Sequence, residues 1–195
     1  MISITRTWAI AAAIFSFTFS ASMFANTKAE LQNLVPQIKS IANDPAVIRA
    51  ADAANQAHAK LSKTDIRNLS REWHAGIAGK SSDVLTEVNN SNLSTHLKDI
   101  QAQKPDTYAS ILVMDAKGLV LGQTYNTPHY SQASQPVWRK INQEGASAVY
   151  FGKVKKTDAG DLASIGVPVV ANQQVIGAVL VQVKVPATTK TPTTK

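Results

Sequence analysis

The chain has 195 residues, a formal net charge of +7 at pH 7 and no cysteine. This length allows one domain with a sizeable core, and the lack of cysteine excludes disulfides and thiolate chemistry. The basic residues are scattered among acidic ones, without a run of five or six like charges. We therefore expect no nucleic-acid interface.

Residues 1–25 have the pattern of a secretory signal peptide. Arg6 precedes an apolar run over residues 8–19, and small residues then lead into polar sequence. The run is short for a spanning helix, which needs about 20 apolar residues. Met23 fits the cleavage motif poorly, so cleavage after Ser22 and retention as an anchor both stay open. We expect an exported protein, periplasmic or secreted.

Residues 26–106 have the periodicity of helices. Apolar residues recur at helical spacing in four segments: 31–41, 45–59, 62–77 and 92–103. The first helix is expected to begin at a capping box over residues 27–30, and the second at the cap Asp44. Residues 81–91 are polar, and we expect them to be irregular. The sequence thus predicts a helical lead-in.

Residues 108–123 predict a β-hairpin. Two apolar runs, 111–114 and 119–122, flank the turn Asp115-Ala116-Lys117-Gly118. Gly118 supplies the positive φ that such a turn needs. We expect Asp115 to organise the turn.

The rest of the chain predicts more sheet. Residues 127–143 read as a loop ending in a short helix over 136–142, because Pro128 and Pro136 exclude a continuous strand. Strands follow in three segments: 146–155, 162–170 and 175–185. Pro168 favours an edge or a bulge, and alternation in the last segment predicts an antiparallel sheet with one solvated side.

The expected fold class is α+β, with N-terminal helices before an antiparallel sheet of about five strands and a loop-helix insertion. The tail, 186–195, has too little apolar content to order itself.

The runs ILVMDAKGLVLGQT, NTPHY, QPVW, AVYFGKV, SIGVPVV and VIGAVLVQV, in this order, resemble the PDC/Cache family of extracytoplasmic sensor domains. The resemblance implies a PAS-like sheet over residues 107–185 behind the helical lead-in. It also implies a cavity between sheet and insertion for a small metabolite such as a carboxylate, amino acid or amine. Signalling would need a separate, membrane-bound partner. Helical lead-ins of this family often pair between subunits, so a homodimer is compatible with the resemblance.

The same resemblance points to ligand-binding residues. By position, Tyr130 and Trp138 match aromatic residues of the family's insertion, and Tyr150 follows on the next strand. Acidic residues common in the family are replaced by Ala133-Ser134-Gln135. This change favours a neutral or anionic ligand, by charge complementarity, or a cavity no longer used.

Three further residues complete the predicted ligand site. Gln123 and Tyr125 carry polar groups beside the insertion, and Arg139, with Lys140, is suited to clamping a carboxylate. For the aromatic residues the alternative is packing of the insertion onto the sheet. Trp73, at helical spacing, is expected in the core.

The sequence predicts no enzyme, no metal site and no cofactor. The four histidines are far apart in the sequence, and neither a phosphate loop nor a nucleophile elbow is present. The leading hypothesis is an exported, stand-alone sensor module that binds a small metabolite. The alternatives are an interaction protein that kept the fold without a ligand, and a hydrolase of unknown type.

Overall fold

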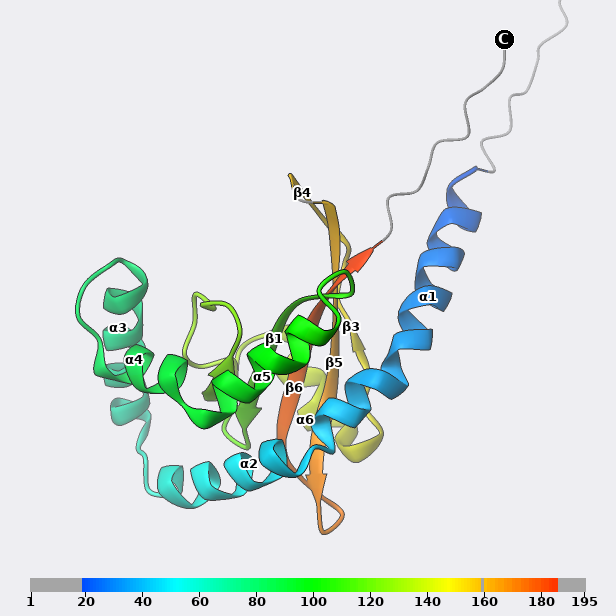
Figure 1. Cartoon of the computed structure of the whole chain (residues 1–195). Helices are drawn as coiled ribbons and strands as arrows, with labels where there is room; N and C mark the ends of the chain where they lie inside the picture. Colours follow the sequence, from blue (N-terminus) through cyan, green and yellow to red (C-terminus); the bar gives the residue numbers. More distant parts are fainter. Residues whose placement is uncertain (1–18, 159, 186–195) are drawn as a thin grey trace, which may run out of the picture.

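The computed structural model describes residues 19–158 and 160–185. Five helices come first (Figure 1): α1 (Phe19–Ala42), α2 (Pro45–His58), α3 (Lys63–Ile77), α4 (Asp83–Asn90) and α5 (Asn92–Gln103). The remaining elements are β1 (Tyr108–Asp115), β2 (Val120–Gln123), α6 (Pro136–Glu144), the 3-10 turn η1 (Gly145–Ser147), β3 (Tyr150–Phe151), β4 (Lys155–Thr157), β5 (Gly160–Ala171) and β6 (Gln174–Val185). The expected boundary after residue 25 lies within α1, and the first 18 residues of the expected signal peptide lie outside the described residues.

The strands form one antiparallel sheet in the order β2-β1-β6-β5-β3, with β4 also paired to β5. Helix α6 is inserted between β2 and β3. The predicted α+β class, with helices before the sheet and a helix inserted among the strands, is therefore confirmed.

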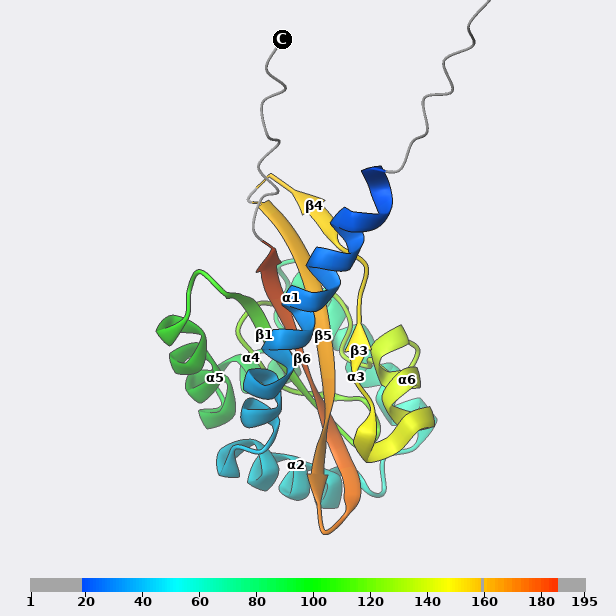
Figure 2. The same ribbon diagram turned by 90° about the vertical axis from the view of Figure 1, so that its right-hand side faces the viewer.

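Helices cover both faces of the sheet. On one face, α1, α2 and α5 build a core with alternate residues of β1, β5 and β6 (Figure 2). On the other face, residues of α3, α4 and α6 build a second core with β1, β2 and β6. Each face therefore has its own apolar core.

Strand β6 shows how the sheet differs from the expected one, in which one side faces solvent. Val179, Val181 and Val183 are buried in the first core, as their alternation predicts. On the opposite face Ala178 is buried in the second core, whereas Lys184 is exposed. Leu180 and Gln182 on the same face are half-buried, so this face is covered in part.

Several predicted ends and breaks are confirmed. Asp44 caps α2, its carboxylate accepting a hydrogen bond from the amide of Ala46 at 2.7 Å. Ser62 and Asp65 form a capping box at the start of α3. Pro168 comes after Gly166, where the pairing of β5 with β3 ends, and just before a bulge that follows Val169. A strand tolerates the missing N–H of a proline at such a place.

Three expectations were wrong. Residues 83–90 form α4, capped by Ser82, instead of an irregular segment. Helix α1 begins at Phe19, so the predicted capping box over residues 27–30 lies inside the helix. The strand expected over 146–155 is broken into η1, β3 and β4, because only two short parts of this stretch find pairing partners on β5.

The β1–β2 hairpin forms as predicted. Gly118 has φ of 75°, and the Asp115 carboxylate accepts hydrogen bonds from the amides of Lys117 and Leu119, both at 2.8 Å. The turn is also docked on α2, since the Lys117 ammonium donates to the carbonyls of His58, Ala59 and Leu61. Asp115 therefore organises the turn, as expected.

Replacing Gly118 with alanine should lower the free energy of unfolding by about 1–2 kcal/mol, because the left-handed conformation costs a residue with Cβ this much. The new Cβ would also lie 3.0 Å from the backbone nitrogen of Ala133. Urea unfolding would measure the loss. Gly79→Ala is the matched control, since Gly79 also has positive φ but nothing lies within 4 Å of its added Cβ. We expect a smaller loss of stability in this control. An equal loss of stability in both variants would show that crowding at Ala133 adds nothing.

Candidate functional site

A cavity lies between the sheet and the segment that follows β2. It has a volume of about 140 Å³. Its sheet side includes Ser110 and Leu112 of β1 with Leu180 and Gln182 of β6, and residues 125–128 form the opposite side. The cavity thus lies between the sheet and the start of the segment that leads to α6, and neither Tyr130 nor Trp138 lines it.

The sheet side of this cavity combines polar and apolar groups. Ser110 and Gln182 are paired across β1 and β6, and the Ser110 hydroxyl donates to Oε1 of Gln182 at 3.0 Å. Leu112 and Leu180 are the next pair on the same face of these strands. A mostly apolar wall with a few placed polar groups is typical of small-molecule sites.

Gln123 fixes the segment that closes the cavity. Its side chain is buried, and its amide nitrogen donates to Oδ1 of Asn89 at 2.9 Å and of Asn126 at 3.1 Å. Its amide oxygen accepts from the backbone N–H of Thr127 at 3.0 Å. The polar groups of Gln123 are therefore used within the chain, where they hold two residues that line the cavity.

Trp73 holds the same segment from α3. Its indole N–H donates to the carbonyl of Thr127 at 2.9 Å, and its ring lies 5.4 Å from that of Tyr130. Trp73 is fully buried, which confirms it as a core residue. Its position beside the cavity was not predicted, because helical spacing alone does not show which distant segment a residue contacts.

The predicted aromatic residues occupy different places. Tyr130 and Trp138 are 3% and 7% exposed and belong to the second core, and Tyr150 packs against it. Tyr125 is 74% exposed and lines the cavity. The structure thus brings Tyr125 to the cavity and buries Tyr130 and Trp138 among apolar neighbours.

The predicted carboxylate clamp lies on α6. Arg139 is exposed there, and Lys140 forms an ion pair with Glu144 one turn later. Val137 and Ile141 face the second core. The cationic residues of α6 therefore lie on its outer surface, while the apolar side of the helix packs on the sheet.

Burial raises the pKa of Tyr130 to about 12, with smaller contributions from Asp115 and Glu87. An alkaline titration followed by phenolate absorbance should therefore show a tyrosine that ionises well above the ordinary tyrosine value of about 10. Because the pKa of Tyr130 is higher in the folded than in the unfolded chain, the neutral phenol stabilises the fold below the unfolded pKa of about 10. This contribution to the free energy of unfolding is lost as the pH rises towards 12. The absorbance change near pH 12 should be absent in Tyr130→Phe. If it persisted there, it would belong to another residue.

The histidines take part in separate contacts. His58 lies 2.7 Å from Asp115, and His96 lies 2.9 Å from Asp44. His74 and His129 are brought together with ring centres 5.6 Å apart. Across residues 19–158 and 160–185 there is no group of three or more histidine, aspartate or glutamate side chains placed to hold a metal ion. No helix in this part of the chain is long and apolar enough to cross a membrane.

Comparison with known proteins finds similarity in structure only. No protein-family model matches the sequence, and no curated protein matches it. Among solved structures, the ligand-binding domain of the Pseudomonas aeruginosa PAO1 amino acid chemoreceptor PctC in complex with GABA is 13% identical, with a TM-score of 0.36. That match covers 61% of this chain and 55% of the receptor domain.

Two further similar structures are a chemoreceptor domain and a histidine kinase sensor domain. The ligand-binding domain of the Campylobacter jejuni chemoreceptor Tlp3, in complex with 4-methylisoleucine, is 9% identical, with a TM-score of 0.38. That match covers 81% of this chain and 60% of the Tlp3 domain. The sensor domain of the Vibrio cholerae histidine kinase DctB is 15% identical, with a TM-score of 0.37. That match covers 84% of this chain and 57% of the kinase domain. The chain thus spans little more than half the length of these domains.

Proposed function

We propose that this protein is an exported sensor module that binds a small metabolite between its sheet and residues 125–128. The observation that carries the proposal is the cavity itself, with the Ser110–Gln182 pair on one side and the anchored segment on the other. Its volume of about 140 Å³ is near the 150 Å³ that accepts a benzene-sized molecule. The bound state would be presented to a separate signalling protein in the membrane.

The residues around the cavity favour an uncharged ligand or a small carboxylate. Serine, threonine, asparagine, glutamine and tyrosine supply its polar groups, and no lining residue is charged. Hydroxyl and amide groups can donate to a carboxylate or exchange hydrogen bonds with an amide. A lone charge of either sign would find no opposite charge among the lining residues, so a carboxylate would depend on the hydroxyl and amide donors alone.

The closing segment is held in place before any ligand arrives. Gln123 and Trp73 bind it from two directions, through the backbone amide and carbonyl of Thr127. A site whose walls are already ordered binds with a smaller entropic cost. This preorganisation supports a binding role for the cavity.

The alternative is an interaction protein that binds no small molecule. It is favoured by the burial of Tyr130 and Trp138 in the second core and by the internal hydrogen bonds of Gln123. These residues serve the fold without any ligand.

A thermal-shift screen of organic acids, amino acids, amines and nucleobases separates the two functions. A ligand that binds only the folded state stabilises it by about 2.7 kcal/mol at a hundredfold excess over its Kd. We expect a dose-dependent rise in melting temperature for a neutral compound or a carboxylate. A flat screen would favour the interaction protein, and a hit confined to cationic amines would contradict the proposed ligand chemistry.

A further inference from the structure

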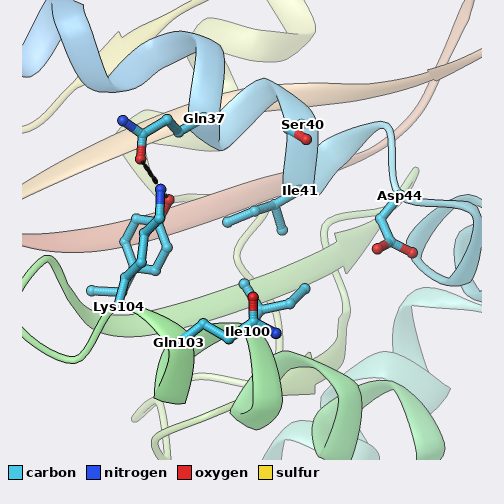
Figure 3. Close-up of a pocket in the computed structure, with 8 residues that line it drawn as sticks. Gln37, Ser40, Ile41, Asp44, Ile100, Gln103 and Lys104 are labelled. Carbon is cyan, nitrogen blue, oxygen red and sulfur yellow. Dashed lines mark hydrogen bonds between the residues drawn. The ribbon is translucent and has the colours of Figure 1, made fainter.

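A second cavity lies on the opposite face of the sheet, in the groove between α1 and α5 (Figure 3). It has a volume of about 280 Å³, twice that of the cavity beside residues 125–128. Ile41 of α1 and Ile100 of α5 lie in the middle of the groove, and Ser40 and Gln103 bring polar groups to its walls. The groove therefore offers an apolar centre with hydrogen-bonding groups around it.

One end of the groove carries a positive charge. The Lys104 ammonium donates to Oε1 of Gln37 at 2.6 Å, which ties the residue after α5 to α1. An ammonium has three donors, so two remain for an anionic partner. The hydroxyl of Tyr108 lies beside the same Gln37 oxygen, at 3.4 Å.

The other end carries a negative charge. The Asp44 carboxylate accepts from the amide of Ala46 and pairs with Nε2 of His96, yet its side chain remains 25% exposed. Burial would raise the pKa of Asp44, but the hydrogen bond from His96 and those from the backbone outweigh it and hold the pKa below its usual value. Asp44 is therefore ionised at neutral pH.

The distance between the two ends sets the length of a ligand that reaches both. Gln37 and Ala42 are separated by a helical rise of about 7.5 Å, and Asp44 follows two residues later, so the charges are on the order of 10 Å apart. An extended chain spans about 3.3–3.6 Å per residue. The two terminal contacts take up about 2.8 Å each, so about 4–5 Å remain between the ligand's own charges. A single amino acid falls short of this length, whereas about two residues match it.

We infer that the groove between α1 and α5 binds a short peptide with free termini, its ammonium group at Asp44 and its carboxylate at Lys104. Ile41 and Ile100 contact its side chains. Charges of opposite sign at the two ends fix the direction of the peptide. This site is independent of the cavity beside residues 125–128, so either proposal can fail without the other.

Dialanine is the probe that tests this inference, added to the full chain labelled at isoleucine methyl groups. We expect the methyl resonances of Ile41 and Ile100 to shift with saturation. Blocking the amino terminus by acetylation, or the carboxyl terminus by amidation, should each weaken binding about two- to fivefold, the range of an exposed ion pair.

Two variants assign the termini to their ends. Asp44→Asn keeps a residue that caps helices well but removes the charge, so acetylated and free dialanine should bind it equally. Lys104→Gln should in the same way remove the preference for a free carboxylate. Lys39→Gln is the control, since Lys39 is exposed on α1 and does not line the groove. Unchanged Ile41 and Ile100 resonances in the wild type, or equal binding of free and blocked peptides, would overturn the inference.

Discussion

Replacing Trp73 with alanine should lower the free energy of unfolding by about 3–5 kcal/mol, the usual cost of removing a buried tryptophan from a core. Trp73 is fully buried, its indole N–H binds the carbonyl of Thr127, and its ring packs against Tyr130. The substitution leaves a void in the second core. It also removes one of the two side chains that hold residues 125–128 beside their cavity. We therefore expect ligand affinity to fall as well.

Urea unfolding of two further variants tests this assignment. Trp73→Phe keeps most of the ring and removes the hydrogen bond, so its loss should be smaller. Tyr125→Ala alters a side chain that is 74% exposed and should change stability by no more than about 0.5 kcal/mol. A Trp73→Ala protein as stable as Tyr125→Ala would show that Trp73 does not anchor the second core.

Replacing Asp115 with alanine should lower the free energy of unfolding by about 3–5 kcal/mol, because two amides of the turn lose a charged acceptor and each such hydrogen bond is worth about 1.5–3 kcal/mol. Asp115 is fully buried, accepts the amides of Lys117 and Leu119 on one oxygen, and pairs with His58 on the other. Without the carboxylate, these amides lose their partner in the turn and the hairpin loses a link to α2.

Denaturant unfolding measures this loss as well. Asp115→Asn retains an oxygen for the turn amides, so it should be less damaging than alanine. Asp99→Ala is the matched surface control, because Asp99 is exposed on α5. If Asp115→Ala unfolded at the same urea concentration as Asp99→Ala, the hairpin would not depend on this carboxylate.

The elements that could be predicted are those whose determinants are local. The Asp115–Gly118 turn, the caps of α2 and α3 and the limits of α5 depend on residues within a few positions of one another. Helix α4 was missed because its short apolar stripe, Val84, Leu85 and Val88, is buried only by contact with distant residues.

The site was harder to predict because its contacts are distant in the sequence. Trp73 reaches Thr127 across 54 positions, and Gln123 reaches Asn89 across 34. A tyrosine or tryptophan in the insertion suits a pocket and a core equally well. Burial separates the two here, with Tyr130 inside and Tyr125 outside.

The central claim is that a ligand occupies the cavity between the sheet and residues 125–128. The most direct test is calorimetric titration of the best thermal-shift compound into the wild type, Ser110→Phe and Ser134→Phe. Ser110 lines the cavity, so phenylalanine there should fill it, whereas Ser134 is exposed and does not line it. We predict that Ser110→Phe abolishes binding and that Ser134→Phe retains the wild-type Kd. Equal affinity in all three proteins would place the ligand elsewhere and contradict the account.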